Sequence, residues 1–145
     1  MNKVSSVGLF CDDVRPEISG QQTIVGVYGD NLALSQIPGA LPKLGFFVRV
    51  NFEMSFKFET LSHKLMLSNG TLFFENNIDA DLIKQSINEA REVNSPIYGF
   101  KTFGVAMNFP VESAGRLNLF SVVDGTDYLA ATLNFSFNPA VAPTA

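Results

Sequence analysis

The side chains best suited to chemistry in this sequence are carboxylates that fall in expected turns. They are Asp12, Asp13, Glu17, Asp30, Asp124 and Asp127. Carboxylates gathered on loops can bind Ca²⁺, which takes about six to eight oxygen ligands. The sequence has no Asp-x-Asp-x-Asp-Gly loop, however, and Asp13 and Asp30 are expected at opposite ends of one strand. Because aspartate also stabilises turns by accepting hydrogen bonds from loop amides, we predict turn-stabilising roles and no metal site.

Cys11 and His63 are the remaining candidates for nucleophilic or acid–base chemistry. A cysteine nucleophile needs a lowered pKa and a nearby base, but the adjacent Asp12 and Asp13 disfavour the thiolate. His63 is the single histidine and lies beside Lys64 between two expected strands, so we predict that it is a surface turn residue. Without a nucleophile and base in view, and without a glycine-rich phosphate loop, we predict no enzyme activity, no catalytic residue and no cofactor.

The composition is that of one domain with few charges. The chain has 145 residues, of which 17% are charged, and its net charge is −4. Since soluble domains usually carry about 25% charged residues, we expect a partner to cover part of the surface; a monomer with a polar, uncharged surface is the alternative. The negative charge argues against nucleic-acid binding, which needs a basic footprint. No run approaches the roughly 18 apolar residues of a membrane span, and the single cysteine fits the reducing cytoplasm.

The elements that must position these side chains are organised around residues 46–58. Apolar residues occupy every even position of this segment, and polar residues occupy every odd position after Phe47. This alternation is typical of a β-strand with one buried face. At about 3.3 Å per residue the segment would span about 43 Å, so we expect it to bend near Glu53 or to be shared between two sheets. The preceding residues 31–43 contain two prolines, which predict no regular element there.

Other segments with strand or helix patterns flank this strand. Strands are expected at 4–10, 22–28, 64–68, 71–74, 103–109, 115–123 and 129–137. Asn69-Gly70 predicts a type I′ hairpin turn, and Asp124-Gly125 predicts another tight turn. One helix is expected at 79–93, with Asp79 as its cap and a narrow apolar stripe that would lie across a sheet edge or one end of the fold.

These elements predict an all-β fold. About eight strands and one short helix favour an antiparallel two-layer β-sandwich, with a partly closed β-barrel as the alternative. We expect residues 1–138 to form a single domain and residues 139–145 to form an extended C-terminal tail.

Several short motifs resemble a known group of sequences. They are Cys-Asp-Asp-Val-Arg at 11–15, Gly-Val-Tyr-Gly-Asp at 26–30, Leu-Pro-Lys-Leu at 41–44 and Val-Asp-Gly at 123–125. In these motifs the chain resembles an uncharacterised family of small all-β proteins from bacteria and phages. The resemblance implies a β-sandwich and a microbial or phage source, and it implies no catalytic residues.

Two late strands have small, uncharged residues at the positions expected to face outward. These candidate interface residues are Gly104, Ala106, Asn108, Ala130, Thr132, Asn134 and Ser136. If the two strands share a sheet, their outer face would be smooth and could accept a neighbouring subunit without desolvating charge. The alternative is that the helix or the tail covers this face.

Two hypotheses about function follow. The leading one is a non-catalytic structural or interaction protein, assembled in the cytoplasm as a phage component that packs against itself or a larger scaffold. The alternative is a soluble intracellular binding module, a regulator or anti-defence protein, that captures a ligand or host protein through the loop at 11–20. The candidate binding residues of that loop are Asp12, Asp13, Arg15 and Glu17, among which Arg15 is expected to pair with a carboxylate.

Overall fold

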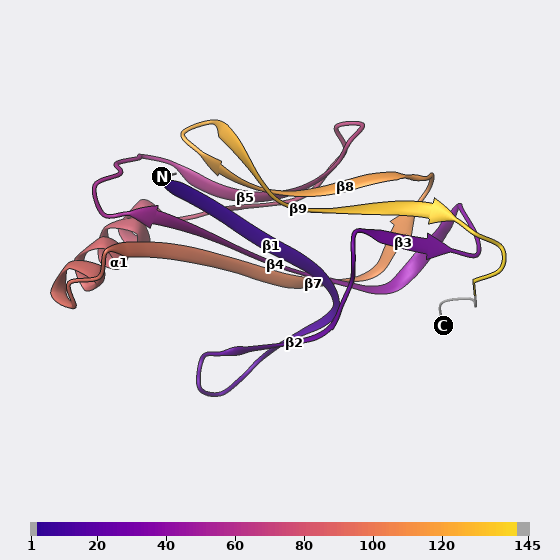
Figure 1. Cartoon of the computed structure of the whole chain (residues 1–145), viewed down its shortest axis with the longest axis horizontal. Coiled ribbons are helices and arrows are strands. Elements are labelled where there is room, and N and C mark those ends of the chain that lie inside the picture. Colours follow the sequence, from indigo (N-terminus) through magenta and orange to yellow (C-terminus); the bar gives the residue numbers. More distant parts are fainter. Residues whose placement is uncertain (1–2, 142–145) are drawn as a thin grey trace.

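Two β-sheets stacked face to face make up the fold in the computed structural model, which describes residues 3–141 (Figure 1). The elements in chain order are β1 (Val4–Pro16), β2 (Gln22–Val27), β3 (Asn31–Leu34), β4 (Gly39–Glu53), β5 (Leu61–Leu67), β6 (Leu72–Asn77), α1 (Ala80–Glu92), β7 (Ile97–Val111), β8 (Gly115–Val123) and β9 (Thr126–Phe137). A four-stranded sheet has the order β2-β1-β4-β7, and a five-stranded sheet has the order β3-β9-β8-β5-β6. The predicted two-layer sandwich is confirmed.

Strand β4 is central to the four-stranded sheet, as its alternating pattern predicts. Val48, Val50 and Phe52 are fully buried between the two sheets. The strand ends at Glu53, whose carbonyl accepts a hydrogen bond of 2.9 Å from the amide of Phe56 in a turn. The predicted bend near Glu53 is therefore confirmed, and the prediction that the strand runs on to residue 58 is wrong. Beyond the turn, residues 56–58 fold back so that their apolar side chains cover Phe52.

Three other details differ from the predictions. Residues 31–43 are not irregular, because they hold β3 and the beginning of β4. Strand β3 pairs in parallel with β9, so the sandwich is not wholly antiparallel. Of Asn69 and Gly70, Gly70 alone has a positive φ (95°), and its amide donates to the carbonyl of Leu67 at 2.9 Å. That geometry excludes the predicted type I′ turn, which needs positive φ at both residues.

The predicted helix is confirmed as α1, which lies at one end of the sandwich beside the beginning of β7 (Figure 1). The Asp79 side chain caps it by accepting a hydrogen bond of 2.7 Å from the amide of Asp81. Ile83 and Ala90 bury its apolar stripe against the same core region as Phe52. Residues 142–145 of the expected tail lie outside the described residues, while the amide of Val141 donates to the carbonyl of Asn138 at 3.2 Å.

The predicted turn at Asp124-Gly125 is confirmed, and Asp124 also ties it to the segment before β5. Both turn residues have positive φ angles, 48° and 80°. The Asp124 Oδ1 accepts hydrogen bonds of 2.9 Å from the amides of Thr60 and Glu59, which hold the pKa of this carboxyl below its usual value. One carboxylate thus satisfies two backbone donors from a distant loop.

We expect Asp124→Ala to lower the free energy of unfolding by about 1–3 kcal/mol, because two amides lose their acceptor and alanine disfavours positive φ. Asp124→Asn keeps an acceptor oxygen and tolerates this φ, so it should lose clearly less. Urea unfolding followed by circular dichroism measures both variants. Equal losses for Ala and Asn would show that the side-chain oxygen does not matter.

Candidate functional site

The residues predicted to form one interface are divided between two sheets. Strand β7 belongs to the four-stranded sheet and β9 to the five-stranded sheet, so the seven candidates do not share a face. Gly104 lies against the buried ring of Phe46, where an added Cβ would come within 3.1 Å of a ring carbon. Ala106 and Ala130 pack against the core. The predicted smooth face is therefore wrong.

The outward positions of β9 instead join a polar network on the five-stranded sheet. The Thr132 hydroxyl donates to the Asn118 amide oxygen at 2.7 Å, and the Asn134 amide oxygen accepts from Arg116 at 3.2 Å. Ser136 is exposed at the same end of β9. These contacts make the part of this outer face around Arg116, Asn118, Thr132 and Asn134 polar and internally bonded.

A paired irregularity in β4 and β7 explains why the faces of β7 are reversed. Pro42 cannot donate a backbone hydrogen bond, and Asn108, at the same level of the neighbouring strand, has a positive φ of 51°. On one side of this point Phe109 is buried, whereas on the other side Met107 is 62% exposed. Alternation from Phe109 therefore assigns the wrong face to the rest of β7, and Asn108 itself is exposed at the kink.

The reversal creates an apolar outer face on the four-stranded sheet. We define the outer apolar band as Val7, Leu9, Phe47, Phe103, Val105 and Met107. Their chain neighbours Phe10, Phe46 and Thr102 are buried, so the band must face away from the core. Leu9 is paired directly with Phe47, which is paired with Phe103. The band thus crosses three strands without interruption.

The band is bordered by positive charge. Arg49 on β4 is paired with Lys101 on β7, and with Val7 on its other side. Two like charges directly opposite each other destabilise a sheet, although the Arg49 Nε donates to the Asn51 side chain at 2.8 Å. An acidic group from a partner would relieve this repulsion.

The candidate binding residues of the 11–20 segment lie mostly in a strand. Asp12, Asp13 and Arg15 belong to β1, and only Glu17 lies in the turn to β2. Arg15 donates to Asp13 at 3.2 Å, which confirms one of the expected pairings and holds the pKa of Asp13 below its usual value. Figure 1 shows that the end of β1 and β2 form a hairpin that extends away from the two layers.

The other two carboxylates of this hairpin also have partners within it. Asp12 accepts a hydrogen bond of 2.5 Å from the Tyr28 hydroxyl, and burial together with this carboxylate raises the pKa of Tyr28. Glu17 accepts a hydrogen bond of 2.8 Å from the Thr23 hydroxyl. The carboxylates therefore stabilise the hairpin.

Cys11 occupies a close approach between β1 and β4. Its side chain is fully buried, and a Cβ added to the neighbouring Gly45 would lie 2.7 Å from its Sγ. Burial raises the pKa of this thiol, and the nearby carboxylates act in the same direction. The thiol is therefore shielded from solvent and has an environment that disfavours the thiolate needed by a nucleophile.

The prediction that His63 is a surface turn residue is wrong, because its side chain is fully buried. It lies within β5, where it points inward together with Leu61 and Leu65. Its Nδ1 is 2.7 Å from the Thr102 hydroxyl oxygen, and no described group hydrogen-bonds its Nε2. Loss of solvation lowers the pKa of His63 to about 4.

The histidine is part of a polar layer that divides the core. We define the buried polar layer as Ser6, His63, Asn76, Thr102 and Ser121. His63 is paired across the sheet with Ser121, but the Ser121 hydroxyl bonds to that of Ser6 at 2.7 Å and is itself fully buried. A substrate cannot reach this serine and histidine, so the layer serves packing.

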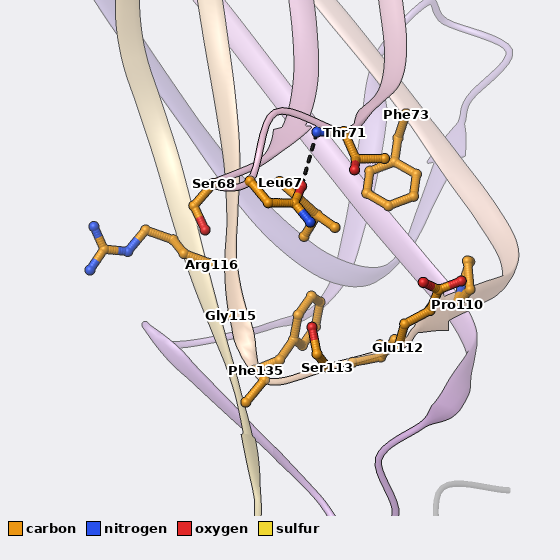
Figure 2. A pocket seen from close by; sticks show the side chains of 13 residues that line it. Leu67, Ser68, Thr71, Phe73, Pro110, Glu112, Ser113, Gly115, Arg116 and Phe135 are labelled. Carbon is orange, nitrogen blue, oxygen red and sulfur yellow. Dashed lines mark hydrogen bonds between the residues drawn. The ribbon is translucent and has the colours of Figure 1, made fainter.

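A pocket of about 180 Å³ opens between the β5–β6 turn and the β7–β8 turn (Figure 2). Leu67, Phe73 and Phe135 supply apolar lining, and Ser113 contributes a hydroxyl. Figure 2 shows the Arg116 side chain directed away from the pocket. The volume is below the roughly 300 Å³ of common ligand sites, and no histidine or cysteine is among the described residues that line it. This pocket offers no pair of nucleophile and base.

Residues 3–141 lack two further features that would indicate a function. No group of three or more His, Cys, Asp or Glu side chains is close enough there to hold a metal ion. No helix within that range has the length and apolar character needed to cross a membrane. The outer apolar band is therefore the candidate functional site. Sequence reasoning missed it, although the adjacent pair Phe46-Phe47 signals a strand that is apolar on both faces.

Comparison with known proteins places the chain in a family but finds no individual curated relative. The chain matches no curated protein. A family model described as a family of unknown function (DUF6941) matches residues 6–136, which is most of the chain. The chain therefore belongs to this family of unknown function, DUF6941.

Proposed function

We propose that this protein is a non-catalytic interaction component that binds a protein partner on the outer face of its four-stranded sheet. The observation that carries the proposal is the outer apolar band, which crosses three strands. A contiguous apolar surface that is at least partly exposed is a feature of protein–protein interfaces. Val7 and Met107, at its two sides, are 52% and 62% exposed. Binding of a partner would therefore remove much of the band's apolar surface from contact with water.

The paired polar and charged residues on the outer face of the other sheet support this choice of surface. There Lys64 lies over the Phe120 ring, 5.2 Å from its centroid, and binds Asp127 at 3.0 Å. Internal partners of this kind reduce the need for an external one. The hairpin of the alternative hypothesis is less favoured because Asp12, Asp13 and Glu17 are hydrogen-bonded within it.

We extend the proposal to the setting suggested by the resemblance and the low charge. The protein would be assembled in the cytoplasm into a larger structure, such as a phage particle, through protein contacts. It would act there as a structural element without a cofactor.

Site-specific photo-crosslinking tests the proposal. A photoreactive amino acid at position 107 is expected to crosslink the protein to a defined partner when the labelled chain is returned to its native cells. Leu129, 55% exposed on the other sheet's outer face, is the matched control position, since Met107 is 62% exposed. Crosslinks at 107 but not at 129 support the proposal. Equal crosslinking at both positions, or none at 107, would overturn it.

A further inference from the structure

The two sheets have four edge strands, and β7 is the least protected of them. Strand β3 has four residues, and β6 has six, including a glutamate and two asparagines. Strand β7 has fifteen residues, of which Lys101 alone is charged. Natural sheets protect their edges with charges, prolines or short strands, because an unprotected edge pairs with another strand. From Ile97 to Phe109, β7 has a single charged residue and no proline.

The hydrogen-bond phase of β4 and β7 shows which peptide groups are free on this edge. The amide of Met54 donates to the carbonyl of Pro96 at 3.2 Å, at the beginning of the ladder. Because bonded pairs alternate along an antiparallel ladder, the even-numbered residues of β7 bond to β4. Odd-numbered residues from 97 to 107, which include Phe103 and Val105, direct their N–H and C=O groups away from the sheet. A strand added here would also extend the outer apolar band.

The opposite edge of the same sheet is complementary in charge. It is formed by β2, whose Val25 and Val27 are 38% and 60% exposed. The hairpin places β2 away from the two layers, so its edge is accessible (Figure 1). The charged residues around this edge are Asp12, Asp13, Arg15, Glu17, Asp30 and Lys43, whose ammonium lies 3.9 Å from the Asp13 carboxylate. Acidic residues therefore dominate at the β2 edge, whereas Lys101 and its neighbour Arg49 make the β7 edge basic.

The strand directions allow these two edges to meet. Each neighbouring pair in β2-β1-β4-β7 is antiparallel, so β2 and β7 run in opposite directions. We propose that β7 of one copy pairs with β2 of a second copy in the same orientation, giving a continuous antiparallel sheet. Val25 and Val27 would extend the outer apolar band beside Val105 and Met107, and the acidic β2 edge would lie beside the basic β7 edge. This head-to-tail contact repeats, as a filament or a closed ring.

The proposal rests on the proposed function, for which it names the partner as another copy of this chain. Two double variants at partly or largely exposed positions test it. Val105→Glu with Met107→Glu blocks the β7 edge, and Val25→Glu with Val27→Glu blocks the β2 edge. The single variants Met107→Glu and Val27→Glu, at positions that are 62% and 60% exposed, replace a double variant that fails to fold. Circular dichroism verifies folding.

Light scattering after size exclusion gives the masses. The wild-type protein is expected to exceed the 15.8 kDa of one chain increasingly with concentration. Each blocked variant alone is expected to be a monomer, and an equimolar mixture is expected to form a 1:1 dimer through the one intact β7–β2 contact. A β2-blocked variant that still dimerises alone would overturn the head-to-tail arrangement in favour of two-fold β7 pairing. A wild-type monomer at every concentration would overturn self-association, and crosslinks of Met107 to a different protein would then still support the proposed function.

Discussion

Replacing Phe52 by alanine is expected to lower the free energy of unfolding by about 3–5 kcal/mol, the usual cost of removing a large buried aromatic side chain. Phe52 is fully buried. Its ring centroid lies 4.2 Å from that of Phe58 and 5.4 Å from that of Tyr98. Since small domains are stable by only about 5–15 kcal/mol, the variant should lose a large part of its stability. Thermal and urea unfolding followed by circular dichroism measure the loss.

Phe56→Ala is the matched control for this prediction. The Phe56 ring stacks on Phe52 at 5.8 Å between centroids but is only partly buried. Its removal leaves a space that water can fill, so the expected loss is clearly smaller. If both variants lost the same free energy, the stacked aromatic cluster would not be centred on Phe52.

Lowering the pH from 8 to 5 is expected to destabilise the protein by about 2 kcal/mol through His63. The reason is that the pKa of this imidazole is lower in the folded state than in the unfolded state. The pKa falls from 6.5 to about 4 when the imidazole is buried. Between these values the unfolded chain binds a proton that the folded chain does not. The free energy of unfolding is therefore highest above the unfolded pKa of about 6.5 and falls as the pH decreases below it. Below a pH of about 4, His63 causes no further decrease, because both states then bind the proton.

The readout for His63 is the change of stability with pH, measured by urea unfolding at pH 5 and pH 8. His63→Leu removes the titrating group while Thr102 keeps its hydrogen bond of 3.1 Å from the Asn76 amide. This variant should lose most of the pH dependence, whatever its stability at pH 8. A wild type and variant with the same pH dependence would contradict the assignment of the acid sensitivity to His63.

The parts of the fold that the sequence predicts well are those in which one pattern acts locally. The alternation from Phe46 to Phe52 and the cap at Asp79 each depend on neighbouring residues. The reversed faces of β7 could not be predicted in this way, because Pro42 and Asn108 lie far apart in the sequence and adopt their local geometry together. The outer apolar band depends on that reversal.

The burial of His63 was within reach of the sequence. Leu61, His63 and Leu65 alternate with polar residues in the pattern of a strand. Treating histidine as polar placed the residue in a turn, whereas an imidazole can lie in a core when it finds a hydrogen-bond partner. That partner, Thr102, comes from the other sheet, and only the packing of the two sheets brings it near.

The buried polar layer has a consequence for how the two sheets align. Apolar side chains alone would tolerate several relative positions of the sheets, because the hydrophobic effect is not directional. The Ser6–Ser121 and His63–Thr102 contacts each join one sheet to the other. A shift by two residues would separate both pairs and leave polar atoms unsatisfied in the core, at about 1–3 kcal/mol for each group. The buried polar layer therefore favours one alignment of the two sheets over alignments shifted by two residues.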